Sequence, residues 1–540
     1  MKRYLSIFVL AVMSMAVGAV PAKRGAIIRT MADGTEKEVY LHGNAFDHYI
    51  TDKDGNWLDE ETLEPMNAEM KAARLEGNMK RAQRRKVLQE QQGGSKLNLA
   101  PRGLVILVNF KNKSFVTPYD TIKNMLDGEN YTRNYSYSYK YQGMTYKDTI
   151  KCSGSARKYF KDQSFGQYNP IFDVVGPYTV SKEYAYYGKN VSGDDSNPGM
   201  MIKEACELAD ADGADFTLYD NNNDGYVDFV YVIYAGYGEA DGGPSETIWP
   251  HNYQLFPNNK WYGIRCEVDG KLVDNYACSN EIAYLSDVYN GIGTICHEFS
   301  HVLGLPDLYE TNTSPLGLHT LMEWDILDYG PYNNDGNTPP AYSAYERFFM
   351  RWLTPRVLSG AENVTLRSLN EHQEALLLCK NGTHNLIGNN PDPTTFYLIE
   401  NRPKTGWDAY LPGQGMLLTK IMYDETSWYA NTVNNSASKM GVNLIEAKTN
   451  NSSKGKATDA FPRGATSWAR DGHSVENIEW NENNQIITFQ YSYDPQDIEN
   501  VQSDKGQSTK VFRDGQILIL RNGNLYDLNG RKMEYENHQL

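Results

Sequence analysis

The pattern of apolar and polar residues divides the chain into regions of different character. Two continuous apolar runs, at 104–110 and 227–235, have the length and composition of strands buried on both faces. A helical pattern begins after Ser155, a residue type suited to cap a helix start, and another helix is expected to end at Gly304. Because strands and helices alternate from about 100 to 355, a mixed α/β domain is predicted there.

Beyond residue 355 the helical signals fade. Short stretches in which apolar residues alternate replace them, at 396–400, 416–422 and 485–491. This pattern predicts a β-sandwich-like domain to about residue 495. In the last part of the chain, apolar runs at 517–520 and 524–528 flank Asn522-Gly523, the dipeptide most typical of a tight hairpin.

The first residues have the layout of a signal peptide. Lys2 and Arg3 precede an apolar run that ends at Val20, and the small residues Ala19 and Ala22 both offer a cleavage position. The run is short for a membrane span, and no second one follows it. We therefore expect a secreted or cell-surface protein with no transmembrane segment after signal cleavage.

The region from 23 to 98 has a character of its own. Two short strand-like pieces, at 38–41 and 46–51, lead through an Asp-Gly turn to a polar helical run at 65–92 that is rich in lysine and arginine. Such a basic stretch is open to trypsin-like cleavage, which favours a propeptide over an ordinary linker. The expected fold class is α+β, with a signal peptide at 1–22, a propeptide-like leader at 23–98, a catalytic domain at 99–355, a β-rich domain at 356–495 and a tail at 496–540 that is a possible secretion or sorting domain.

Charge and cysteine content narrow the function further. The formal net charge of −16 over 540 residues argues against a nucleic-acid partner. The six cysteines are few for this length, and Cys266 and Cys278, which flank a hairpin-like segment, are the expected pair if a disulfide forms.

The strongest chemical signal is the sequence HEFSHVLGLPD at 297–307. On a helix, residues four apart share a face, so His297 and His301 can present both imidazoles to one metal ion. Gly304 permits a turn that returns Asp307 as a third ligand. Two imidazoles and one carboxylate leave a fourth position for water, as in a catalytic Zn²⁺ site. Glu298 then lies close enough to act as general base. Glu346, on a later helix, is the rival third ligand.

A second metal motif lies at 220–228, where the sequence reads DNNNDGYVD. Oxygen-bearing residues at alternate positions, with glycine at the sixth, are typical of loops that wrap around Ca²⁺. The twelfth position is Tyr231 rather than glutamate, and a strand follows, so this is not an EF-hand. Calcium ligands are expected at Asp220, Asn222, Asp224 and Asp228; the alternative is an Asx-rich turn before a strand.

Several segments together resemble the immune inhibitor A family of secreted metallopeptidases. The segments that carry the resemblance are HEFSHVLGLPDLY (297–309), WDILDYG (324–330), TPPAYSAYERFFMRWLTP (338–355), YDNNNDGYVD (219–228), VIYAGYGEA (232–240), TIWPHN (247–252) and FYLIENRPKTGWDAYLPGQGML (396–417). The resemblance implies a metzincin-like zincin fold with a propeptide and a C-terminal β domain, acting as an extracellular endopeptidase.

The chain departs from the family pattern at a few positions. Leu327 stands where the family has a methionine beneath the metal, with Met322 as an imperfect substitute. Gln414 replaces a histidine, and Thr419-Lys420 replaces Trp-His in the next strand. By the same comparison with metzincins, Tyr329 is a candidate to contact the metal or the oxyanion.

The predicted function is therefore a zinc-dependent endopeptidase acting on proteins or peptides. The alternatives are an impaired zincin scaffold that serves as an exported binding or adhesion protein, favoured by Leu327, and a zinc hydrolase of non-peptide substrates. The leader is expected to inhibit the enzyme. Because it contains no cysteine, His42, His48 or a leader carboxylate is the candidate to block the metal. The segment 234–238 is the candidate edge strand that grips substrate.

Overall fold

The computed structural model describes most of the chain. The described residues are 19–30, 36–44, 47–60, 62–76, 102–141, 144–191, 193–260, 263–312, 317–448, 455–494, and four strands between 509 and 533. Within these residues, no helix has the length and apolar character that crossing a bilayer requires. The signal-peptide prediction falls largely on residues outside this set, as does the basic part of the leader.

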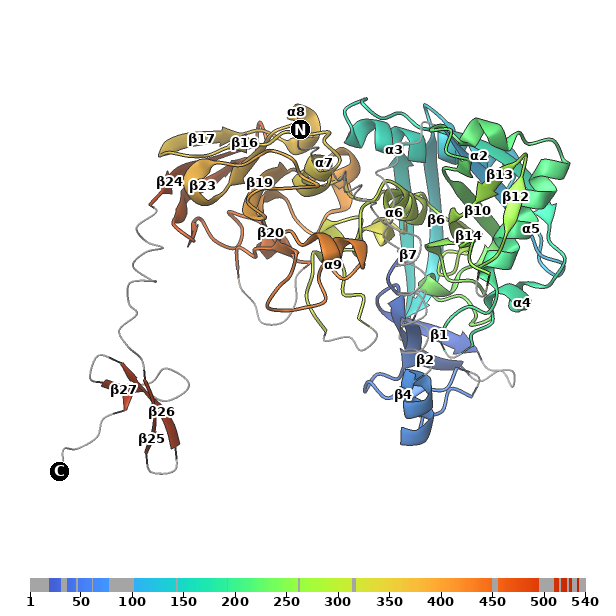
Figure 1. Cartoon of the computed structure of the whole chain (residues 1–540), viewed down its shortest axis with the longest axis horizontal. Helices are drawn as coiled ribbons and strands as arrows, with labels where there is room; N and C mark the ends of the chain where they lie inside the picture. Colours follow the sequence, from blue (N-terminus) through green and yellow to red (C-terminus); the bar gives the residue numbers. More distant parts are fainter. Residues whose placement is uncertain are drawn as a thin grey trace, which may run out of the picture.

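A six-stranded sheet forms the centre of the catalytic region (Figure 1). Its strands run in the order β11-β14-β10-β5-β8, and β15 pairs with the end of β14. The core strands β14, β10, β5 and β8 are parallel, and β11 joins antiparallel to β14. The strands are β5 (Arg102–Asn109), β8 (Ile171–Thr179), β10 (Val230–Tyr237), β11 (His251–Gln254), β14 (Asn275–Ala283) and β15 (Val288–Tyr289).

The apolar run at 104–110 forms β5 because both faces of this strand are covered. Leu104, Ile106 and Val108 enter one hydrophobic core, and the alternate residues Val105 and Leu107 enter another. The expected edge strand at 234–238 is wrong, because it lies largely in β10, between β14 and β5. A continuous apolar run belongs in the interior of a parallel sheet, and the polar β11 is an edge instead.

Helices cover both faces of this sheet, which makes the catalytic region mixed α/β. Ser155 caps α3 as predicted, since its side chain accepts a hydrogen bond from Lys158 N. The helices of the region are α2 (Tyr119–Asp127), α3 (Ala156–Gln163), α4 (Tyr184–Gly188), α5 (Pro198–Ala211), α6 (Gly293–Val302) and α7 (Ala344–Phe349), with 3₁₀ turns η1 (Phe216–Tyr219), η2 (Glu239–Asp241), η3 (Met322–Trp324) and η4 (Gly330–Tyr332).

Two smaller β structures belong to the same region. A long hairpin pairs β6 (Thr132–Tyr141) with β7 (Met144–Ser153). A three-stranded sheet, in the order β12-β13-β9, contains β9 (Tyr226–Val227), β12 (Cys266–Val268) and β13 (Lys271–Val273). The expected pairing of Cys266 with Cys278 is wrong: the Cys266 thiol lies beside Cys206 of α5, and Cys278 lies on β14 beside His251. All six cysteines are free thiols.

After residue 355 two mainly antiparallel sheets share one hydrophobic core. One has the order β16-β18-β19-β20-β21 and the other β17-β24-β23-β22, and apolar residues from both enter the same cluster. The predicted strands at 396–400, 416–422 and 485–491 all form. The elements are β16 (Arg356–Val357), β17 (Glu362–Leu366), α8 (Leu369–His372), β18 (Ala375–Leu378), η5 (Lys380–Gly382), β19 (Thr395–Arg402), η6 (Gly406–Tyr410), β20 (Gly415–Met422), α9 (Glu425–Tyr429), β21 (Val442–Leu444), η7 (Ala457–Asp459), β22 (Trp468–Arg470), β23 (His473–Asn481) and β24 (Ile486–Tyr493).

The leader and the tail each form a small four-stranded sheet. The leader sheet runs β1 (Ala26–Thr30), β2 (Glu36–Asn44), β3 (Asp47–Thr51), β4 (Trp57–Leu58), and residues 68–76 follow as a helix. The tail sheet runs β25 (Thr509–Arg513), β26 (Gln516–Arg521), β27 (Asn524–Tyr526), β28 (Lys532–Met533). In the predicted hairpin, Arg521 pairs with Asn524.

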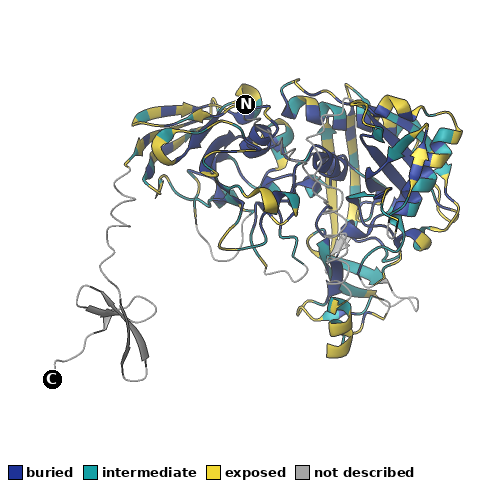
Figure 2. Ribbon diagram, viewed as in Figure 1, coloured by how far each residue is buried: buried dark blue, intermediate teal, exposed yellow. Residues whose placement is uncertain are grey.

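Burial is deepest around α6. The central sheet and this helix are dark blue in Figure 2, and the exposed residues lie at the rims and on the leader. The hydrophobic core that contains α6 also takes in side chains from α7, β19 and β20, so one core continues from the catalytic region into the β-rich region.

Candidate metal centre

The fold holds helix α6 completely inside the protein. Every residue from Gly293 to Val302 is buried. Gly293 is required at its start, because a Cβ there would come within 1.9 Å of Pro331 O. At the other end Gly304 has φ +94°, a backbone conformation that glycine adopts freely, and the chain reverses there as predicted. The turn brings Asp307 back toward the helix.

Three side-chain atoms converge beside α6. The distance from His297 Nε2 to His301 Nε2 is 3.0 Å, and Asp307 Oδ1 lies 3.2 Å from each of these nitrogens. None of the three side chains has an exposed surface. The structure therefore brings together the three residues that the sequence predicted as zinc ligands.

Hydrogen bonds on the far side of each imidazole fix its orientation. His297 Nδ1 lies 2.6 Å from the carbonyl of Ile326, and His301 Nδ1 lies 2.8 Å from that of Leu305. Because a carbonyl only accepts, each Nδ1 carries a hydrogen, so in the neutral ring each Nε2 is the nitrogen with a lone pair for a metal ion.

The donor set fits a zinc ion. Ligand atoms about 2.0–2.1 Å from a tetrahedral Zn²⁺ lie about 3.3 Å apart, close to the separations found here. Two imidazole lone pairs and a carboxylate oxygen at such short distances repel one another unless a cation lies between them. In addition, Asp307 Oδ1 is buried and has no hydrogen-bond donor among the described residues.

The charges of this cluster are strongly coupled. Burial lowers the pKa of both histidines, but Asp307 outweighs burial at His301 and raises its pKa to about 9. Burial favours the neutral form of Asp307, yet the two histidines hold its pKa well below the usual range. The site thus strongly favours a positive charge next to the Asp307 carboxylate.

Asn431 of the β-rich region holds Asp307 from behind. Its Nδ2 donates to Asp307 Oδ2 at 2.6 Å, and its Oδ1 accepts from Asp307 N at 2.7 Å. This residue was not predicted from the sequence, because Asn431 lies 124 positions after Asp307 and belongs to no recognisable motif.

Glu298 lies beside this cluster and contacts Val20. Residues 19–22, which were assigned from the sequence to the end of the signal peptide, are counted with the leader from here on. Its Oε1 accepts a hydrogen bond of 2.9 Å from Val20 N, and its Oε2 is buried without a donor among the described residues. Burial raises the pKa of Glu298 well above its usual value, while His301 acts in the opposite direction. A carboxylate that accepts a proton more readily than usual is suited to act as a general base.

The leader residues that follow Ala19 lie along the same site. Tyr309 donates its hydroxyl hydrogen to Ala19 O, Trp249 Nε1 donates to Val20 O at 3.0 Å, and Tyr332 donates to Pro21 O at 2.6 Å. Ala19 and Val20 are buried. A leader segment therefore lies across Glu298 with its carbonyls bound.

The expectation that His42 or His48 lies on the metal ligands is wrong. The ring of His42 contacts Thr51 and stacks on Tyr49, both in the leader itself. His48 pairs with Glu239 at 3.0 Å and stacks on Trp249. The backbone of the leader, rather than a side chain, reaches the site.

The turn after η3 contacts the histidine pair through the carbonyl of Ile326. Leu327 is buried, and its carbonyl accepts from Leu308 N at 2.8 Å, so a leucine fills the floor position. Met322, at φ +60°, begins the same turn. The Tyr329 ring lies against the Arg24 guanidinium at 4.8 Å, and Tyr309 instead contacts the peptide group at Glu298.

Glu346 has a different task from that of a metal ligand. It forms a capping box with Ser343 at the start of α7, and its Oε1 is buried without a donor among the described residues. Burial and the charge of Asp325 raise its pKa well above the usual value. Asp307, whose Oδ1 lies 3.2 Å from both imidazoles, is the carboxylate next to the histidines.

The candidate calcium loop is compact. Asp220 accepts from Asp224 N and Gly225 N, while Asp228 accepts from Asn221. Lys271 Nζ lies 2.6 Å from Asp220 Oδ2, so an ammonium group already balances one of its carboxylates. Asn222 donates to Asp224 Oδ2 at 3.0 Å. The calcium assignment stays a prediction.

Comparison with known proteins agrees with this site. The family model of the immune inhibitor A peptidase M6 catalytic domain matches residues 90–354. The chain is 29% identical over 232 residues to pre-pro-metalloprotease PrtV of Vibrio cholerae serotype O1, which covers 38% of this chain and 25% of PrtV. It is 26% identical over 223 residues to Immune inhibitor A of Bacillus thuringiensis subsp. alesti, which covers 36% of this chain and 31% of that protein.

The domain with the histidine pair on α6 is thus the catalytic domain of a metallopeptidase. Residues 90–354 are thus similar to the immune inhibitor A family, peptidase M6, as the sequence resemblance implied. The matches span only about a quarter to a third of the curated relatives, which are the longer proteins.

Proposed function

We propose that this chain is an exported zinc endopeptidase of the zincin type, which cleaves proteins or peptides after its leader is removed. The observation that carries the proposal is the convergence of His297 Nε2, His301 Nε2 and Asp307 Oδ1 at 3.0–3.2 Å. A zinc ion held by these atoms would supply a Lewis acid that polarises a peptide carbonyl and makes water acidic.

Two further residues of the chain have defined parts in the proposed reaction. Glu298 takes the proton of the attacking water at its carboxylate and passes it to the nitrogen of the leaving amine. Tyr309 donates its hydroxyl hydrogen to the carbonyl oxygen as negative charge develops there. The leader supports both roles, because its Ala19–Val20 peptide group accepts from Tyr309 and donates to Glu298.

We assign the oxyanion role to Tyr309 rather than to the predicted Tyr329. Tyr309 reaches the carbonyl that stands next to Glu298, whereas the Tyr329 ring faces Arg24 of the leader. Tyr309→Phe is expected to lower kcat with little change in KM, and Tyr329→Phe to leave kcat nearly unchanged.

The same contacts support inhibition by the leader. The segment Ala19–Pro21 covers Glu298 and occupies the donors Trp249 and Tyr332, so substrate cannot use them. Signal cleavage after Ala19 would place the new amino terminus, Val20, at Glu298. Cleavage after Ala22 would remove this segment. N-terminal sequencing of the exported protein, together with its activity before and after leader removal, distinguishes cleavage after Ala19 from cleavage after Ala22.

The decisive experiment uses an unfolded protein substrate and the chain freed of its leader. Glu298→Gln is expected to keep zinc and lose cleavage by about 10²–10⁴-fold, since general base catalysis is removed. A chelator is expected to abolish cleavage by the unchanged protein. Cleavage that survives in Glu298→Gln contradicts the assignment, and absence of cleavage by a folded, zinc-loaded protein would favour an exported binding scaffold.

Metal analysis of two matched variants tests the third ligand. Asp307→Asn is expected to lose bound zinc, whereas Glu346→Gln, at an equally buried carboxylate, is expected to keep it in the folded fraction. The opposite pattern would make Glu346 the ligand.

A further inference from the structure

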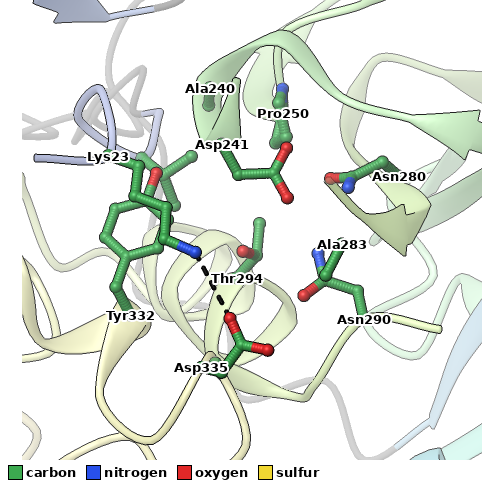
Figure 3. A pocket seen from close by; sticks show the side chains of 12 residues that line it. Lys23, Ala240, Asp241, Pro250, Asn280, Ala283, Asn290, Thr294, Tyr332 and Asp335 are labelled. Carbon is green, nitrogen blue, oxygen red and sulfur yellow. Dashed lines mark hydrogen bonds and ion pairs between the residues drawn. The ribbon is translucent and has the colours of Figure 1, made fainter. Parts of the chain in front are cut away.

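A small polar cavity lies beside the metal centre, and a leader lysine enters it. Figure 3 shows the Lys23 side chain reaching in, with the carboxylates of Asp241 and Asp335 on either side. Asn280, Asn290 and Thr294 line the remaining wall. The cavity is therefore acidic and rich in hydrogen-bond acceptors.

Both the backbone and the side-chain ammonium group of Lys23 are bound by the catalytic domain. Its backbone N donates to Ala240 O at 2.7 Å, and its Nζ lies 3.3 Å from Asp335 Oδ1. The Asp335 side chain is only 4% exposed, so this ion pair is largely shielded from solvent. Tyr135 donates to the other oxygen of Asp335 at 3.2 Å and fixes the carboxylate in place.

One carboxylate oxygen of Asp241 has no hydrogen-bond donor, even with Lys23 bound in the cavity. Its Oδ2 accepts from Tyr284 N at 3.0 Å, but its Oδ1 is buried without a donor among the described residues. The residue is 8% exposed, and burial raises its pKa to about 6 although the charge of Lys23 acts in the opposite direction. A buried, unpaired carboxylate oxygen is costly and favours a cationic ligand with several N–H donors.

The leader contacts give this cavity a fixed place relative to the reaction centre. The Ala19–Val20 peptide group lies between Tyr309 and Glu298, where the proposed mechanism places the bond to be cut. Counting Val20 as the first residue on the side of the leaving amine, Lys23 is the fourth.

We propose that Asp241 and Asp335 form a specificity site for a lysine or arginine side chain at the fourth position on the leaving-amine side of the bond that is cut. This proposal rests on the proposed peptidase function. The leader then occupies the site with its own Lys23 until it is removed. Arginine suits the site as well as lysine, since its five donors can satisfy both carboxylates.

The test compares two fluorescence-quenched peptides that differ only in lysine or glutamine at this fourth position. The zinc-loaded protein, cut from its leader, cleaves both, and mass spectrometry identifies the bond. The lysine peptide is expected to have a kcat/KM about tenfold or more higher, because a shielded ion pair is lost with glutamine. In Asp335→Asn and Asp241→Asn the ratio is expected to fall toward one while cleavage of the glutamine peptide persists.

Asp287→Asn is the matched control, because it removes the same charge from an exposed position outside the cavity lining and is expected to keep the preference. Equal kcat/KM for the two peptides in the unchanged protein, or an unchanged ratio in both cavity variants, overturns the specificity site alone. Failure to cleave even an unfolded protein overturns the peptidase function and this site with it.

A binding measurement gives a second readout that needs no turnover. A synthetic peptide of residues 20–30 is titrated into leaderless, zinc-loaded Glu298→Gln protein, beside the same peptide carrying Lys23→Gln. The specificity site predicts about tenfold weaker binding of the changed peptide, and a loss of this difference in Asp335→Asn. Equal binding of both peptides contradicts it.

Discussion

The leader and the β-rich C-terminal region both contact the metal centre, but they are attached in different ways. The apolar cluster between the leader and the catalytic domain is small, and Ala240 and Trp249 are its buried members from the catalytic side. In contrast, the β-rich region shares a continuous core with helix α6. The leader contact is suited to be broken once, whereas the C-terminal contact belongs to the catalytic unit.

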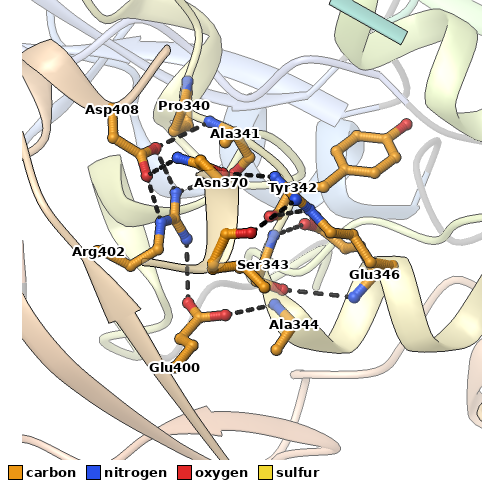
Figure 4. Close-up of polar contacts among 12 residues, drawn as sticks. Pro340, Ala341, Tyr342, Ser343, Ala344, Glu346, Asn370, Glu400, Arg402 and Asp408 are labelled. Atoms are coloured by element: carbon orange, nitrogen blue, oxygen red, sulfur yellow. Dashed lines mark hydrogen bonds and ion pairs between the residues drawn. The ribbon is translucent and has the colours of Figure 1, made fainter. Parts of the chain in front are cut away.

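The polar contacts follow the same division. The leader contacts the catalytic domain through separate ion pairs, Lys23–Asp335 and His48–Glu239. The C-terminal contact is a buried network in which Arg402 pairs with Glu400 and Asp408 and donates to Ala341 O (Figure 4). Glu400 in turn accepts from Ala344 N at the start of α7. This network ties β19 to the segment just before α7, so separating the β-rich region would break the buried hydrogen bonds that Arg402, Glu400 and Asp408 make to the backbone of Ala341 and Ala344.

Removing Arg402 is expected to have the largest effect on stability. Arg402→Met leaves Glu400 and Asp408 buried without their cation, which lowers the free energy of unfolding by about 3–5 kcal/mol. Chemical denaturation followed by intrinsic fluorescence measures the change. Arg356→Met, which breaks the exposed pair with Glu362, is the matched control and is expected to change stability far less. Equal effects of both variants would show that the network does not hold the two regions together.

Removing Asn431 tests whether the C-terminal region also contributes to the metal centre. Asn431→Ala removes both hydrogen bonds to Asp307, and zinc affinity is expected to fall about 10–100-fold. Competition with a chromophoric chelator measures the affinity. Asn435→Ala is the control from the same loop, because Asn435 accepts from Thr311 N instead. If both variants bind zinc as the unchanged protein does, Asp307 needs no support from this region.

The leader contact is expected to weaken at high pH. Burial lowers the pKa of His48, but Glu239 outweighs it and raises the pKa from 6.5 to about 10 in the docked leader. The His48–Glu239 pair therefore stabilises the docked leader fully below about pH 6.5, and this stabilisation is lost as the pH rises toward 10. Activity of the uncut chain, divided by that of the leaderless protein, is expected to increase at least about tenfold between pH 7 and 10.

His48→Gln is expected to remove this pH dependence and to leave the uncut chain more active at pH 7. His42→Gln is the control, because the His42 ring contacts only Tyr49 and Thr51 among the partners described for it. A ratio that stays flat with pH in the unchanged chain shows that His48 does not control the docking of the leader.

Local signals were enough to predict much of the catalytic region. The apolar run at 104–110 became β5, and the His297–Asp307 spacing became a converged donor set, because both depend on neighbours within one element or one turn. Tyr309 could also have been found, since residues two apart on an extended segment share a face with Asp307.

Long-range partners could not be predicted in this way. Asn431 reaches Asp307 across 124 positions, and no pattern around Asn431 points to a metal centre. The expected edge strand at 234–238 failed because the strand order depends on how distant strands pair. The contact of Val20 with Glu298 was missed because the segment at 19–22 was interpreted only as the end of a signal peptide.

The smallest expected effect concerns the loop at 220–228, which lies away from both contacts. Saturating calcium is expected to raise Tm by about 5 °C, since a site filled at 100 times its Kd contributes about 2.7 kcal/mol. Calcium must then displace the Lys271 ammonium from Asp220. Asp224→Asn is expected to abolish the shift. If calcium has no effect and Lys271→Met lowers Tm, the lysine is the permanent partner of Asp220, and the loop is an Asx-rich turn that the chain itself neutralises.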